Sequence, residues 1–76
     1  MNWDNKVLTI NNIEYLVIES VTIDNNVYVY LVNNNDESDS MFREIVNDNG
    51  LEIRTIDPDF FKTILLPLFS SKIANN

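Results

Sequence analysis

The stretch 13–32 constrains this chain more than any other. Two runs of β-branched and aromatic residues, 13–23 and 27–32, flank Asp24-Asn25-Asn26. Such residues favour strands because they pack well on a pleated, half-buried surface. Asn tolerates the positive φ that tight turns between antiparallel strands require. The stretch therefore predicts a long β-hairpin. Apolar residues alternate onto both faces of its first strand, so we expect that strand to be central and covered on both sides.

Further strands are predicted at 7–10, 41–46 and 51–56. Asn11-Asn12 would join the first of these to the long hairpin in a two-residue turn. Asn49-Gly50 is typical of a type I′ turn, which needs positive φ at both central positions. Residues 33–40 read NNNDESDS and contain nothing that is easily buried. They predict an exposed, mobile acidic loop.

The pattern changes to a helical period at Asp57-Pro58. Asp57 is a good N-cap, Pro58 suits the first helical position, and Asp59 complements the helix dipole. An apolar stripe follows at helical spacing, formed by Phe60, Phe61, Ile64, Leu65 and Leu68. Because Pro67 removes a hydrogen-bond donor, we expect the regular helix to span 58–66 and to continue to 73 as a bent segment.

These elements predict an α+β domain, a five-stranded antiparallel meander with a C-terminal helix packed on one face. The 76 residues are enough for one domain, 1–76. A domain of this size is only marginally stable, and without cysteine it has no disulfide to support it. We therefore expect a well-packed core or self-association, which makes a homo-oligomer a reasonable prediction.

The chain has no His and no Cys. The commonest general base, the best nucleophile and the two commonest transition-metal ligands are therefore missing. A loose echo of a calcium loop runs from residue 33 to residue 44. Its oxygen ligands would be Asn33, Asn35, Glu37, Asp39 and Glu44, but Ser38 stands where the turn needs Gly. We predict a solvated acidic loop, and no catalytic residue, metal or other cofactor; the chain is not expected to be an enzyme.

The charge balance of 5 basic against 12 acidic residues gives a net charge of −7. This charge repels nucleic acids and anionic membrane surfaces, so we expect no direct binding to either. The N-terminal residues lack the apolar run of a secretory signal, and residues 64–69 are too few to span a membrane. A cytoplasmic location is the resulting prediction.

Three segments carry a resemblance to known small proteins: 12–20 (NIEYLVIES), 28–33 (YVYLVN) and Arg43-Glu44-Ile45. The chain resembles the acidic proteins of the YrzB-like domain of unknown function. It is also similar to small proteins of phages and mobile elements in low-GC Gram-positive bacteria. The resemblance implies this fold, a cytoplasmic setting and a phage or mobile-element origin, and it brings no catalytic residues. The chain departs from it in being rich in Asn rather than Glu and in having Pro67 in the helix.

Two surfaces are candidates for partner binding. The first is apolar and lies on the C-terminal segment, with Phe61, Leu65, Leu66, Leu68, Phe69 and Ile73 as its residues. These side chains spread wider than one small sheet covers easily, so either the sheet buries them all or part of them forms an interface. The leading hypothesis is a non-enzymatic protein-binding or regulatory module, possibly homodimeric, that uses the helix or an edge strand.

The second surface is acidic and consists of Asp36, Glu37, Asp39, Glu44 and Asp48. Acidic residues usually serve solubility. They could also mimic the charge of nucleic acid and occupy the basic groove of a host defence nuclease, as small anti-CRISPR proteins do. An acidic inhibitor of a basic, nucleic-acid-binding protein is therefore the alternative hypothesis.

Overall fold

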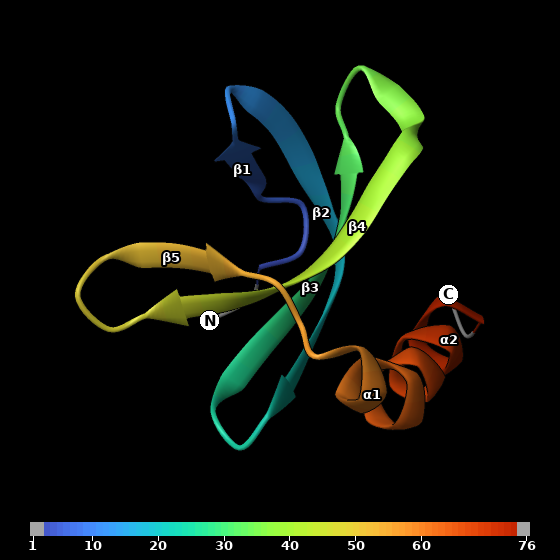
Figure 1. The fold of residues 1–76 in the computed structure, drawn as a ribbon. Helices are drawn as coiled ribbons and strands as arrows, with labels where there is room; N and C mark the ends of the chain where they lie inside the picture. The colour runs from blue at the N-terminus through green and yellow to red at the C-terminus, as the bar shows by residue number, and fades with distance from the viewer. Residues whose placement is uncertain (1–2, 75–76) are drawn as a thin grey trace.

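The computed structural model describes residues 3–74, which form one antiparallel sheet followed by a helix (Figure 1). Within these residues the sheet has five strands in the order of the sequence. They are β1 (Val7–Ile10), β2 (Ile13–Ile23), β3 (Asn26–Asn33), β4 (Asp36–Asn47) and β5 (Leu51–Arg54). The helical segment comprises α1 (Pro58–Phe60), the π-helical η1 (Phe61–Leu65) and α2 (Leu66–Ala74). The predicted α+β meander with a C-terminal helix is confirmed.

Two of the turns form where the Asn-rich segments predict them. Asn11 and Asn12 have φ of 52° and 66° and join β1 to β2. Asp24 and Asn25 have φ of 49° and 69° and join β2 to β3, whereas Asn26 is already the first residue of β3. Asn and Asp tolerate the left-handed conformation better than other residues with a side chain. Local chemistry therefore sets both hairpins.

The prediction of a loop at 33–40 is wrong, because β4 begins at Asp36 rather than at residue 41. The turn is only two residues long, and the Asn35 N–H donates to Asn33 Oδ1 at 2.8 Å. Val32 pairs with Ser40 and Asn33 with Asp36, so residues 37–39 form an unpaired bulge in β4. Pairing with β3 overrides the low strand propensity of this polar segment.

The last hairpin also differs from its prediction. Asn47 pairs with Leu51, which leaves a three-residue loop at 48–50. Gly50 has φ of 120°, but Asn49 is not among the residues with positive φ, so the turn is not type I′. The following strand is also shorter than predicted and ends at Arg54 instead of residue 56.

A β-bulge divides β2 between the two faces of the sheet. Val17 pairs with Leu31 and Glu19 with Tyr30, so Ile18 is the extra residue. Because side chains alternate along a strand, one extra residue moves everything after it to the other face. Val21 therefore lies on the face opposite Val17, and the sheet has a buried cluster on each side.

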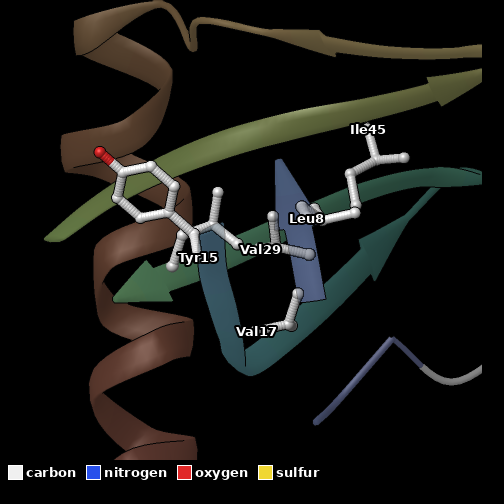
Figure 2. Close-up of a cluster of buried hydrophobic side chains, with 6 residues drawn as sticks. Leu8, Tyr15, Val17, Val29 and Ile45 are labelled. Atoms are coloured by element: carbon white, nitrogen blue, oxygen red, sulfur yellow. The ribbon is translucent and has the colours of Figure 1, made fainter. Parts of the chain in front are cut away.

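The cluster on the concave side belongs to the sheet itself (Figure 2). Its buried members come from the first four strands: Leu8, Tyr15, Val17, Val29, Leu31 and Ile45. Trp3 and Met41 pack at its border. The Tyr15 ring extends away from the other labelled side chains, with its hydroxyl at the margin of the cluster, which lets a polar tip accompany a buried apolar ring.

The helix begins as predicted but ends differently. The Asp57 carboxylate accepts a hydrogen bond from the Phe60 N–H at 3.0 Å, and Pro58 is the first helical residue. The prediction of a regular helix over 58–66 with a bent extension to 73 misplaces the irregular part, since residues 61–65 are π-helical and regular α-helix runs from Leu66 through Pro67 to Ala74. Ahead of Pro67 the Leu66 N–H bonds to the Phe61 carbonyl, five residues earlier. This wider π turn relieves the clash between the proline ring and the preceding turn.

Candidate interaction surface

The convex face of the sheet carries the helix over part of its area. The register aligns Glu19, Tyr30 and Phe42 in one cross-strand row, and Val21, Tyr28 and Glu44 in the next. Leu65 and Phe69 pack on these rows and are 0% and 1% exposed. The Phe42 ring lies 4.9 Å from the Phe69 ring and 4.7 Å from the Phe61 ring, measured between centroids. The helix is thus seated on aromatic residues of β3 and β4.

The C-terminal end of the helix is fixed to β2. Lys72 Nζ donates to the Ser20 carbonyl at 2.6 Å and lies 3.5 Å from Glu19 Oε1. Glu19 is buried, so its carboxylate needs such a partner. This contact defines how far along β2 the helix reaches.

Beyond that point the convex face is not covered by the helix. Val7 of β1 pairs with Leu16 of β2, which pairs with Val32 of β3. We call these three residues the apolar row. Directly opposite side chains in a sheet have Cβ atoms about 4.5–5.5 Å apart, so the row is continuous. Val7 is 51% exposed, and none of the three belongs to either buried cluster of residues 3–74.

The apolar row corrects one expectation about β2. We expected both faces of β2 to be covered. This is true of its second half, where Val21 lies beneath the helix, but not of its first half. There Leu16 is half-buried and Ile18, at the bulge, is 42% exposed. Neither residue belongs to the cluster that the helix covers in the described part of the chain.

An open pocket of about 570 Å³ adjoins the apolar row. It lies between the β1–β2 and β3–β4 turns, which Figure 1 shows at the same end of the sheet. Its lining residues are Thr9, Asn12, Ile13, Glu14, Asn33 and Asn35. The Asn34 N–H donates to the Glu14 carbonyl at 2.9 Å and holds the two turns together. We call this the end pocket; it offers amide groups and one carboxylate next to an apolar strip.

Glu14 gives the end pocket its charge. Its side chain is exposed and makes no hydrogen bond or ion pair within the described part of the chain. Glu14 pairs with Thr9, one row beyond Val7 and Leu16 on the same convex face. The nearest cation in sequence, Lys6, alternates onto the other face with Leu8. A free carboxylate therefore borders the apolar row.

The predicted apolar surface of the helix is divided by the structure. Leu65 and Phe69 are buried, and Phe61 is half-buried against Phe42. Leu66, Leu68 and Ile73 are exposed, at 41%, 42% and 45%. Leu66 and Ile73 are about two turns apart and share one flank, whereas Leu68 lies roughly 200° around the helix from Leu66. The exposed residues therefore lie on two sides of the helix and form no single patch.

The predicted acidic surface is divided as well. Asp36, Glu37 and Asp39 lie at the start of β4, whereas Glu44 is eight residues farther along that strand from Asp36 and Asp48 lies in the next loop. Because residues 37–39 bulge out, Asp36 lies opposite Asn33 and Glu44 opposite Tyr28, five residues apart on β3, so at roughly 3.3 Å per residue the two groups are separated by about 16 Å. Glu44 lies opposite Arg54 of β5 in the register of the sheet. The pKa of Arg54 is raised, mainly because its side chain hydrogen-bonds to Glu52. These five acids do not form one surface.

Two of these acids have local structural roles. Ser38 donates to Asp36 Oδ1 through its hydroxyl at 2.6 Å and its N–H at 3.1 Å, and these bonds lower the pKa of Asp36. Asp39 Oδ2 accepts from the Tyr15 hydroxyl at 2.9 Å and from Asn33 Nδ2 at 3.2 Å. The bulge in β4 thus supplies a carboxylate that closes the margin of the concave cluster.

A second open pocket, of about 330 Å³, lies within the β4–β5 hairpin. Glu52 and Arg54, which line it, form an exposed ion pair at 2.9 Å. Among residues 3–74 no group of three or more His, Cys, Asp or Glu side chains is placed to hold a metal ion. In the same range no helix is long and apolar enough to cross a membrane.

Sequence reasoning missed the apolar row. The alternation in 13–23 predicts apolar side chains on both faces of the strand, but it does not tell which of them the helix covers. The only available signal was that Val7, Leu16 and Val32 share a face in the simplest hairpin register. Comparisons with protein-family models, curated proteins and solved structures find no match to this chain. The resemblance to YrzB-like proteins therefore stays a prediction.

Proposed function

We propose that this chain is a non-enzymatic protein-binding module, and that its contact surface is the apolar row together with the outer edge of β1. The observation that supports this most is the continuous row of Val7, Leu16 and Val32 beyond the end of the helix. Burying apolar surface contributes about 25 cal/mol per Å², so a partner that covers the row gains binding energy from it. Contiguous exposed apolar residues are typical of interaction sites.

The edge of β1 adds backbone groups to this surface. β1 is the first strand of the sheet and pairs only with β2 among the described strands. The Val17 N–H bonds to the Lys6 carbonyl, so by alternation residues 8 and 10 direct their backbone groups toward β2. Val7 and Thr9 consequently direct theirs outward, where an extended segment could pair with them.

The acidic inhibitor has less support. Its five predicted residues are dispersed along β4, and Asp39 is engaged with Tyr15. Experiment can distinguish this hypothesis from binding through the apolar row. An acidic inhibitor that blocks a basic site should bind much more weakly at high salt, and changing Asp36, Glu37 and Asp39 to Lys should abolish its binding. Binding through the apolar row should weaken only modestly under both changes, because burial of apolar surface is not screened and only the long-range attraction to the acids is reduced. A cytoplasmic setting and a mobile-element origin belong to this proposal as further predictions, and self-association is the competing use of the same surface.

The test is a selection of short random peptides displayed on phage, with the immobilised full chain as target. Peptides that bind the wild type are then made synthetically and their affinities measured for two variants. Val7→Lys places a charge in the apolar row and on the edge, so we expect the affinity to fall at least tenfold. Ile64→Lys is the matched control: Ile64 is 44% exposed but lies on the helix, so its affinity should be unchanged.

Circular dichroism establishes that both variants remain folded, and Val7→Thr replaces Val7→Lys if the latter does not. The proposal is overturned if no peptide is enriched over an uncoated surface. It is equally overturned if the enriched peptides bind Val7→Lys as tightly as the wild type while Ile64→Lys loses them.

A further inference from the structure

From this surface we infer the chemistry of the partner: an extended cationic segment that adds to β1 as a further strand. This segment places an apolar side chain beside Val7 and a lysine or arginine, two residues away, beside Thr9 and within reach of Glu14. The inference rests on the proposed function, because it names the occupant of the same surface.

The spacing follows from the sheet. Side chains on one face of a strand recur every second residue, about 6.6 Å apart. Val7 and Thr9 occupy two successive positions of this kind on the convex face, and both are exposed. A paired segment must therefore present its side chains to these two positions from residues i and i+2. The side chain of residue i then contacts the apolar row at Val7, and that of residue i+2 lies beside Thr9, which lines the end pocket.

The charge follows from Glu14. Thr9 is a small side chain opposite Glu14, so a long side chain on the added strand can extend across it to the carboxylate. The amide oxygens of Asn12 and Asn35 in the end pocket can accept further hydrogen bonds from a guanidinium or ammonium group, whereas the Asn33 amide is engaged with Asp39 and Asn35. The net charge of −7 attracts a cationic segment at long range as well.

The same charge argues against a second copy of this chain as occupant. Each copy would bring a net charge of −7 and its own Glu14 to the shared edge. Lys72, a cation on the convex side of the sheet, is already bound to Ser20 and Glu19. A cationic partner therefore satisfies the surface better than self-association does.

The peptides selected on the wild-type chain provide the test. We expect them to share an apolar residue and a lysine or arginine two positions apart. Their synthetic copies should shift the backbone amide resonances of Val7 and Thr9 in nuclear magnetic resonance spectra. They should bind Glu14→Gln about two- to fivefold more weakly, as loss of an exposed ion pair implies. Glu37→Gln, which removes an exposed acid outside the end pocket, should leave the affinity unchanged.

The outcomes separate the two proposals. Enriched peptides that require Val7 but carry no basic residue, or that are indifferent to Glu14→Gln, overturn the cationic partner and leave the binding module intact. A dimer in analytical ultracentrifugation that Val7→Lys dissociates makes a second copy the occupant and also overturns it. Absence of any enriched peptide overturns both.

Discussion

Leu65 and Leu66 are neighbours in the sequence, but only Leu65 contributes to the core. Leu65 lies on the side of the helix that packs on the sheet and is 0% exposed, whereas Leu66 is 41% exposed. Leu65→Ala should therefore lower the free energy of unfolding by about 2–5 kcal/mol through lost burial and a residual cavity. Leu66→Ala should change it by no more than about 0.5 kcal/mol. Urea denaturation of the two variants measures the difference, and equal losses would contradict the placement of the helix.

Tyr15 should titrate abnormally because of its contact with Asp39. The hydrogen bond to Asp39, burial and the charge of that carboxylate, in this order, raise the pKa of Tyr15. A raised folded-state pKa means that the stabilising contribution is complete below the unfolded pKa of about 10. It is lost as the pH rises through the higher folded-state value. Stability should therefore decline in the alkaline range.

Two substitutions isolate this effect. Asp39→Asn should lower the pKa of Tyr15 toward its usual value, as followed by the resonances of its ring. Asp36→Asn is the control, since Asp36 lies in the same strand but is bonded to Ser38 and not to Tyr15. A Tyr15 pKa that is insensitive to Asp39→Asn would mean that the hydrogen bond is absent in solution.

At the scale of the elements, the start of the helix depends on Asp57. Its carboxylate satisfies the Phe60 N–H, which has no partner within the helix. Asp57→Ala should reduce the free energy of unfolding by about 1 kcal/mol, whereas Asp57→Ser retains an oxygen acceptor and most of the stability. Thermal denaturation followed by circular dichroism compares the two. If both variants lost the same amount, the charge rather than the cap would be responsible.

The elements that could be predicted are those that local chemistry determines. Asn11 and Asn25 take positive φ in turns, and Asp57 begins the helix as its position before Pro58 suggests. The misplaced boundaries depend on contacts distant in sequence. The polar start of β4 is a strand because β3 pairs with it, and helical structure passes Pro67 because a π turn precedes the proline and Phe69 packs beyond it. No local pattern encodes these contacts.

The candidate site was less predictable for a reason that lies in the whole molecule. Whether an apolar residue is core or surface depends on how much of the sheet the helix covers. That extent depends on contacts between residues far apart in sequence, such as the packing of Phe69 near Val21 and the hydrogen bond of Lys72 to Ser20 across 52 residues. The bulge at Ile18 adds to the difficulty, because it moves Val21 beneath the helix. The sequence therefore indicated a binding surface on the helix, whereas the continuous apolar row, in which Val7 is exposed and Leu16 and Val32 are half-buried, lies on the sheet.

The net charge of −7 should make the stability of the whole molecule depend on salt. The molecule is 31 Å along its two longer axes. The Debye length is about 30 Å at 0.01 M salt and about 8 Å at 0.15 M, so repulsion acts across the molecule only at low salt. Adding sodium chloride at pH 7 should therefore raise the Tm. A gain of about 1 kcal/mol would correspond to roughly 4–8 °C in a domain of this size.

The control is the same salt titration near pH 4.1, the isoelectric point, where net repulsion vanishes and the Tm should hardly respond. A fall in the Tm with salt at pH 7 would contradict the prediction. It would mean that attraction in the Lys72–Glu19 and Arg54–Glu52 pairs outweighs the repulsion among the acids. That result is not expected, because the exposed Arg54–Glu52 pair contributes only about 0–1 kcal/mol, the partly buried Lys72–Glu19 pair is less affected by screening, and the acids outnumber the cations by 12 to 5.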